Sequence, residues 1–96
     1  MINTSSKNNI KIDGNEFAII KKELEDNRDL WYNDYYYNLA MDRFNNAVKS
    51  WANKDYRISL DLLRDFRPVC PDDFDLTKID LIVTVLTSKA EALQVR

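Results

Sequence analysis

The sequence predicts an all-α protein, a small up-down helical bundle of three long helices plus a shorter N-terminal helix. Apolar residues recur four and three positions apart in two long segments, and a short polar connection separates the second predicted helix from the third. The first set is Tyr37, Met41, Phe44, Val48 and Trp51, and the second is Leu76, Ile79, Val83, Leu86, Ala90 and Leu93. Such spacing places residues on one side of an α-helix, because 3.6 residues make one turn. Each segment therefore has an apolar face that needs a packing partner.

Residues 1–13 are expected to form a flexible tail, ahead of a single helical-bundle domain at residues 14–96. Residues 3–9 are all polar, and such a composition buries too little apolar surface to order a chain. A length of 96 residues leaves room for one domain with one modest core.

The first helix is predicted from about Gly14 to Asn27. Its apolar residues recur three and four positions apart, at Phe17, Ile20 and Leu24. Asp13 and Glu16 stand three residues apart, as in a capping box. An Asp-Gly pair between alternating apolar residues is also typical of a hairpin turn, so a hairpin over residues 10–20 stays open as the alternative.

The second helix is predicted from Leu30 to about Asn53, with Asp29 as its N-terminal cap. This segment contains neither glycine nor proline, and Ala40 and Ala47 lie beside its apolar stripe. The polar connection that follows is so short that the second and third helices must be antiparallel neighbours.

The third helix is predicted from Tyr56 to about Phe66. Asp55 is a suitable cap for its start, and Pro68 stops it because proline disfavours helical geometry in the residue before it. The residues expected to face inward are Tyr56, Ser59, Leu60, Leu62, Leu63 and Phe66.

The last helix is predicted to run to about Gln94, after a stiff corner that contains Pro68 and Pro71. Acidic residues occur at its start, where negative charge meets the positive end of the helix dipole. These residues are Asp72, Asp73 and Asp75. Thr77 and Asp80 offer a second possible capping pair.

The helical hairpin over residues 47–71 resembles one tetratricopeptide unit. The matching positions are Ala47, Tyr56, Ser59, Leu63 and Pro71. The pattern is broken at Lys54, where that family has glycine, and at Phe66, where it has a small residue. Such units bury their cores by stacking on further copies, and no internal repeat is detectable here. The segment is therefore interpreted as a generic helical hairpin, and no family is assigned.

The charge balance favours a protein partner over a nucleic acid. The chain has 14 basic and 16 acidic residues, a net charge of −2, whereas nucleic-acid binders usually show a basic stripe. A nucleic-acid-binding helical domain is the least favoured alternative. It would use Lys49, Lys54, Arg57, Arg64 and Arg67, among which Asp55, Asp61 and Asp65 are interspersed.

The residues that chemistry needs are scarce, so the sequence predicts no enzyme, no cofactor and no metal. The chain has no histidine, the commonest general base and metal ligand. Its one glycine excludes glycine-rich phosphate loops. Cys70 is the only cysteine, and the neighbouring Asp72 and Asp73 are expected to raise its pKa. The two acidic groups, at residues 26–34 and 72–75, are interpreted as helix-start residues.

The sequence also predicts where the protein acts. No segment reaches the ~18 apolar residues that a membrane span needs. The N-terminal residues lack the apolar run of a secretory signal. We therefore expect a cytoplasmic protein with no membrane partner.

The segment at residues 31–37 has more aromatic residues than one buried seam can use. Only Tyr37 joins the core stripe of its helix. The residues left over form a second apolar face: Trp31, Tyr32, Tyr35, Tyr36 and Leu39. Because interfaces favour amphipathic aromatics, we predict that this face binds another protein, which makes the chain a non-enzymatic adapter, small subunit or inhibitor.

Three arrangements of the aromatic face are open. If it is exposed, Trp31→Ala or Tyr35→Ala weakens binding and leaves the thermal melt almost unchanged. The alternative is that the first helix packs over the face. A mixed arrangement, in which the helix covers the row of Tyr32 and Tyr36 and leaves Trp31 and Tyr35 free, is also open.

The last helix has a smaller surplus of apolar residues. Leu81, Val85 and Ala92 lie off its main stripe, and no later segment is expected to cover them. They are a possible oligomer face, and a structural homo-oligomer is the second functional hypothesis.

Overall fold

A computed structural model describes Ile12 and residues 14–94 of the chain, residues 93 and 94 by their backbone alone. The regular structure of these residues is helical throughout. The α-helices are α2 (Gly14–Asp26), α3 (Asp34–Ala52), α4 (Tyr56–Phe66) and α5 (Thr77–Gln94). Two short 3-10 helices, η1 (Arg28–Leu30) and η2 (Arg67–Val69), lie in the connections. The prediction of an all-α fold is confirmed.

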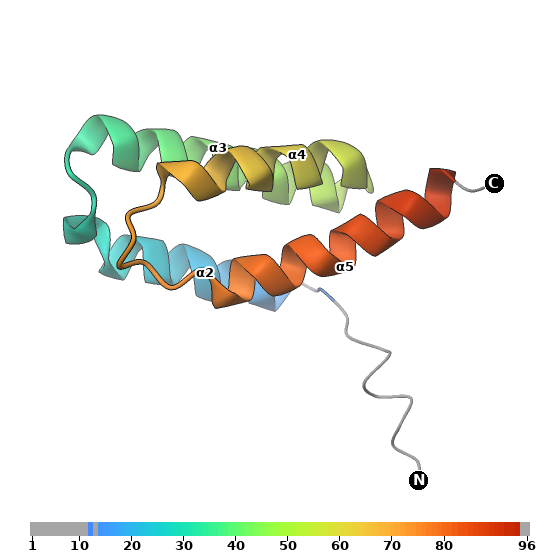
Figure 1. Cartoon of the computed structure of the whole chain (residues 1–96), viewed down its shortest axis with the longest axis horizontal. Coiled ribbons are helices and arrows are strands. Elements are labelled where there is room, and N and C mark those ends of the chain that lie inside the picture. Colours follow the sequence, from blue (N-terminus) through green and yellow to red (C-terminus); the bar gives the residue numbers. More distant parts are fainter. Residues whose placement is uncertain (1–11, 13, 95–96) are drawn as a thin grey trace, which may run out of the picture.

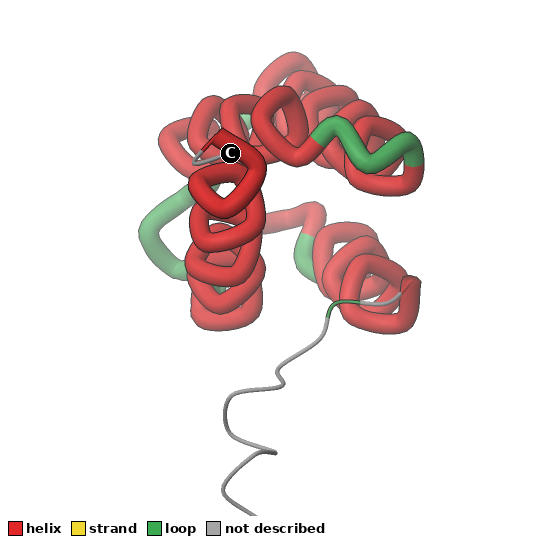
Figure 2. The backbone as a smooth tube through the Cα atoms, turned by 90° about the vertical axis from the view of Figure 1, so that its right-hand side faces the viewer, coloured by secondary structure: helices red, strands yellow, loops and turns green. Residues whose placement is uncertain are grey.

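The helices form two layers. α3 and α4 lie side by side in one layer, and α2 and α5 lie below that pair on opposite sides (Figure 2). α4 makes close contact with both α3 and α5, whereas α2 and α5 touch sparsely. Towards its C-terminal end α5 slants away from α2 (Figure 1).

The interior is one apolar cluster to which all four helices contribute. Its helical members are Phe17, Ile20, Leu24, Tyr37, Ala40, Phe44, Ala47, Leu60, Leu63, Phe66, Ile79, Ile82 and Leu86. Trp31 and Phe74 join it from the connections. Each large side chain buried in this way contributes roughly 1.5–3 kcal/mol relative to exposure.

Helix α2 agrees with its prediction, and the hairpin alternative is wrong over the described residues. The Phe17 ring lies 6.0 Å from that of Phe44 and 5.1 Å from that of Trp51, measured between centroids. Ile12 was expected in the tail, yet it is half-buried and packs against the core. The rest of the expected tail, including Asp13 and its cap, lies outside the described residues.

Helix α3 begins at Asp34, four residues later than predicted, and its cap is not Asp29. Asn33 is the N-cap residue, and its side-chain oxygen accepts a hydrogen bond of 3.1 Å from the backbone N–H of Tyr36. Asp29 instead lies within η1. Residues 31–33 lie between η1 and α3, and the backbone of Trp31 and Asn33 is extended there, so the helix starts only after them.

Helix α4 has the predicted bounds, although the Asp55 side chain makes no capping hydrogen bond. Its expected inward residues are all buried or half-buried. The Ser59 hydroxyl is fully buried and donates a 2.7 Å hydrogen bond to the carbonyl of Ala47, so two small residues meet where α3 and α4 cross. Lys54, before α4, has a left-handed φ of 64°, a conformation that glycine adopts most readily.

Helix α5 buries a broader face than one stripe predicts. Ile79, Leu86 and Ala90 of the predicted stripe are buried, while Leu76 and Val83 are half-buried. The side chain of the remaining stripe residue, at position 93, lies outside the described part. Ile82, which lies off the stripe, is buried as well, because α5 packs on α4 and also approaches α2.

Candidate functional site

The backbone between η1 and α3 separates the aromatic residues into a buried group and an exposed group. Trp31 is 6% exposed and its neighbour Tyr32 is 92% exposed. Trp31 (ψ 138°) and Asn33 (φ −150°, ψ 172°) both have extended backbone, in which successive side chains point to opposite sides. The expectation that Trp31 is exposed on a helix is therefore wrong.

Trp31 contacts three parts of the chain that are separate in the sequence. Its ring stands edge-on to that of Tyr37, with 5.5 Å between centroids and 81° between planes, and lies 5.2 Å from the ring of Phe74. Its indole Nε1–H donates a 3.1 Å hydrogen bond to the carbonyl of Val69. The indole thus joins the start of α3 to the η2 corner and to the loop before α5.

The exposed group is formed by Tyr32, Tyr35 and Tyr36. Tyr35 is 67% exposed and Tyr36 is 46% exposed. Their rings contact each other edge-on, with centroids 5.2 Å apart. Leu39, one turn further along α3, is half-buried. We call Tyr32, Tyr35 and Tyr36 the tyrosine patch.

Helix α2 does not cover the tyrosine patch. Its Phe17 packs farther along α3, against Phe44 and Trp51. Both covering arrangements considered from the sequence are therefore wrong. In the mixed one Tyr35 is free as expected, but Trp31 is buried and the row of Tyr32 and Tyr36 is open.

A small pocket of about 140 Å³ lies beside the tyrosine patch. It is lined by Trp31, Tyr32, Tyr36, Val69, Cys70 and Pro71. The last three residues come from the corner after α4, which Trp31 holds against the start of α3. No sequence pattern indicates this wall, because it lies more than thirty residues away from the patch along the chain.

An ion pair joins η1 to the first residue of α3, beside the tyrosine patch. The Arg28 guanidinium lies 2.7 Å from a carboxylate oxygen of Asp34 and 5.0 Å from the centroid of the Tyr37 ring. The hydrogen bond and the charge of Asp34 raise the pKa of Arg28. Burial raises the pKa of the Tyr37 phenol, so it stays neutral in this contact.

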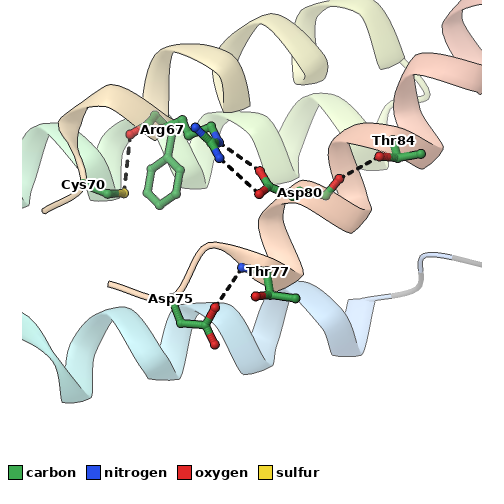
Figure 3. A network of polar contacts seen from close by, with 7 residues as sticks. Arg67, Cys70, Asp75, Thr77, Asp80 and Thr84 are labelled. Carbon is green, nitrogen blue, oxygen red and sulfur yellow. Dashed lines mark hydrogen bonds and ion pairs between the residues drawn. The ribbon is translucent and has the colours of Figure 1, made fainter. Parts of the chain in front are cut away.

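A second ion pair fixes the corner that forms the pocket wall. Arg67 donates two hydrogen bonds, of 2.9 Å and 3.1 Å, to the two carboxylate oxygens of Asp80, and so ties η2 to α5 (Figure 3). These hydrogen bonds lower the pKa of Asp80 and raise that of Arg67. On the loop between them, the Asp75 carboxylate accepts a hydrogen bond from the backbone N–H of Thr77.

Cys70 lies in the pocket wall as a free, half-buried thiol. Burial raises its pKa to about 12, against a smaller opposing effect of Arg67. The expected cause, the charges of Asp72 and Asp73, is wrong. The Cys70 Sγ lies 3.5 Å from the carbonyl oxygen of Phe66, as a weak donor at the end of α4 (Figure 3).

The possible oligomer face on α5 is uneven. Leu81 is 54% exposed and Ala92 is exposed, whereas Val85 is half-buried. Among the basic residues of the nucleic-acid hypothesis, Arg67 is held by Asp80. On the possible oligomer face, Leu81 is therefore the one residue of the three with a large and exposed apolar side chain.

Three observations bear on other kinds of site. Among the described residues, no three side chains of the metal-ligating types converge on one point. None of the helices in this part of the chain has the length and apolar character to cross a membrane. No protein-family model, curated protein sequence or solved structure matches the chain.

Proposed function

We propose that the chain is a non-enzymatic protein–protein interaction module, such as an adapter, a small subunit or an inhibitor. Its partner binds the tyrosine patch and Leu39, with Trp31 as the buried support beneath them. The observation that carries the proposal is the exposure of three tyrosines within five residues, next to a pocket.

The patch suits binding because its backbone is already held in place in the unbound protein. The Asn33 cap and the indole of Trp31 hold the backbone on both sides of Tyr32. Tyrosine loses little conformational freedom on binding and offers a large apolar ring with a polar tip. A few such residues commonly supply most of the binding energy of an interface.

The test compares two double variants of the full chain as immobilised baits. Tyr32→Ser with Tyr35→Ser removes the two most exposed rings of the patch, and Ile19→Ser with Ile58→Ser removes two exposed aliphatic residues elsewhere. A specific partner should be retained by the wild type and by the control, and lost by about 10-fold or more in the patch variant. Equal retention by all three chains would reject the proposal.

The finer architecture and the location belong to the same proposal. We take the helices as an up-down bundle because the connection between α3 and α4 is short and α4 lies between α3 and α5. We place the protein in the cytoplasm, where Cys70 stays reduced and unpaired.

A structural homo-oligomer is the second candidate, favoured by the exposure of Leu81. In that case α5 pairs with α5 of another copy through Leu81, Val85 and Ala92. Sedimentation of the wild type over a range of concentrations tests it, with Leu81→Asp as the disruptive variant and Ile58→Asp as the control. A strict monomer at high concentration would remove this candidate.

A further inference from the structure

We infer that the pocket beside Tyr32 receives a lysine or arginine side chain from a basic segment of the partner protein. This inference rests on the proposed function, because it names the kind of partner that the tyrosine patch binds.

The size of the pocket limits what can enter it. Sites for cofactors and drug-sized ligands generally measure about 300–1,000 Å³, and this pocket measures about 140 Å³. A single side chain of a partner is a more suitable occupant. The pocket is also open on the side of Tyr32, which is almost fully exposed, so a segment lying across the patch can insert a side chain.

The walls suit a long side chain that ends in a cation. Val69, Pro71 and the tyrosine rings offer apolar surface to methylene groups, and the faces of aromatic rings attract positive charge. The same chain already makes such contacts internally. Arg28 lies over the Tyr37 ring, and the Lys89 ammonium lies 5.5 Å from the centroid of the Tyr56 ring.

The charge around the pocket selects a basic partner. All six lining residues belong to the segments 28–36 and 67–75, which together contain five carboxylates and two arginines. Arg67 is paired with Asp80, outside these segments. Asp34 is paired with Arg28, and Asp75 accepts the Thr77 N–H. Within the described residues, Asp29, Asp72 and Asp73 form no ion pair.

The dipoles of α3 and α4 have opposite signs at the pocket, so they do not by themselves favour a basic partner. The C-terminal end of α4 approaches the pocket with its negative pole, while the N-terminal end of α3 approaches it with its positive pole. The Asn33 cap and the charge of Asp34 offset the positive pole. On Cys70 itself the charge that acts is that of Arg67, which is paired with Asp80, so the carboxylates of Asp72 and Asp73, unpaired within the described part of the chain, give the loop before α5 its negative charge.

A second hollow extends the acidic surface along this loop. It measures about 230 Å³ and is lined by Glu23, Asn27, Leu30, Asp73, Phe74 and Asp75. Asp73 and Asp75 therefore line one hollow, and Cys70 and Pro71 of the same connection line the other. In the second hollow Glu23 is paired with Lys78, which leaves Asp73 as its unpaired carboxylate among the described residues. A partner segment with a second cation can reach this carboxylate, which favours a basic run over an isolated charge.

The test is a peptide titration of the isotopically labelled full chain, followed by NMR. The probes are hexa-arginine, hexa-lysine, hexa-glutamine and hexa-glutamate peptides. The chain has two indole signals, and Trp51, near the far end of α3, is a built-in control for Trp31. The two basic peptides should shift the Trp31 indole and the amides of Tyr32 and Cys70, and leave the Trp51 indole unchanged.

Matched variants show whether binding depends on the carboxylates of Asp72 and Asp73, which we call the acidic rim, and on the aromatic ring of Tyr32. Asp72→Asn with Asp73→Asn should weaken binding of hexa-arginine by about 5-fold or more, whereas Asp61→Asn with Asp65→Asn, on α4, should leave it unchanged. Tyr32→Leu keeps an apolar wall without a π face and should weaken binding by about 2–5-fold.

Three outcomes would overturn the inference. In the first, the Trp31 and Trp51 indoles shift equally, which indicates diffuse attraction. In the second, the Asp61 and Asp65 variant weakens binding as much as the rim variant. In the third, hexa-glutamine or hexa-glutamate binds the pocket as well as hexa-arginine, which rejects a basic partner but leaves the tyrosine patch as an interface. Failure of the proposed function itself appears separately, in the bait experiment.

Discussion

Trp31 and Tyr32 are neighbours in the sequence, and the fold gives them opposite environments. The indole of Trp31 is packed between Tyr37 and Phe74 and bonded to the carbonyl of Val69. The ring of Tyr32 is almost wholly in solvent. Both residues have large aromatic side chains with one polar atom, so residue type alone does not predict which of them is buried. The separation comes from a stretch of extended backbone that points consecutive side chains to opposite sides.

Within this short segment, the inward residue stabilises the fold and the outward residues are available for binding. The inward residue secures the corner after α4, and the outward residues lie on a surface that this corner completes as a pocket. Substitutions on the inward side should therefore change the free energy of unfolding, and those on the outward side should change binding alone.

The largest effect is expected for Trp31→Ala. Truncating a large buried aromatic leaves a cavity and an unpaired Val69 carbonyl, so the free energy of unfolding should fall by about 3–5 kcal/mol. This replaces the expectation of an unchanged melt, which assumed an exposed indole. Urea denaturation followed by circular dichroism measures the loss. A change below about 1 kcal/mol would contradict the burial of Trp31.

The next effect concerns the cap that separates the two environments. Asn33→Ala removes the acceptor of the Tyr36 N–H and should lower the free energy of unfolding by about 1 kcal/mol. Asp29→Ala, at the cap position suggested by the sequence, is the matched control and should change it by less than about 0.5 kcal/mol. Thermal melts of both variants decide between the two caps, and equal losses would contradict the observed start of α3.

A smaller effect is expected for the exposed ion pair that holds the same corner. Both side chains of the Arg67–Asp80 pair are about half exposed, so Asp80→Asn should cost at most about 1 kcal/mol at pH 7. Because folding lowers the pKa of Asp80, the contribution is complete above the ordinary carboxyl pKa and is lost as the pH falls through the folded value.

Denaturation curves at a series of pH values check this sign. The difference between wild type and Asp80→Asn should shrink steadily below pH 4 and vanish in strong acid. Asp61→Asn on α4 serves as the control substitution. A difference that grows on acidification would show that the pair does not stabilise the corner.

The smallest effect on stability is expected on the outward side. Tyr32→Ala and Tyr35→Ala should each change the free energy of unfolding by less than about 0.5 kcal/mol, since both rings are mostly in solvent. Thermal melts measure this, while the partner-retention experiment measures the accompanying loss of binding. A large drop in melting temperature would mean that the rings stabilise the fold and would weaken the proposed division.

The sequence predicts most of this fold because its signals are local. The bounds of α2 and α4 follow from apolar spacing and from flanking turn residues, and the inward face of α4, from Tyr56 to Phe66, is correct throughout. Ile82 was missed because α5 faces two neighbours, and a single periodic stripe describes packing against one.

The candidate site was predicted only in part. Tyr32, Tyr35 and Tyr36 are exposed as the surplus of aromatics suggested, whereas Trp31 is not. A helix start at Leu30 placed Trp31 and Tyr35 on one face, but the helix starts at Asp34. Several polar residues near this point suit a cap, and local pattern alone does not choose among them.

By itself, the amino-acid order determined that the chain is helical, where most helices lie and that its aromatics exceed the needs of one seam. Tertiary structure decided which aromatic is buried and where the pocket lies. The physical reason is the range of the interactions. Helix periodicity acts within a turn or two, whereas the Trp31–Val69 contact joins residues far apart in the sequence and exists only once the corner after α4 has packed against the start of α3.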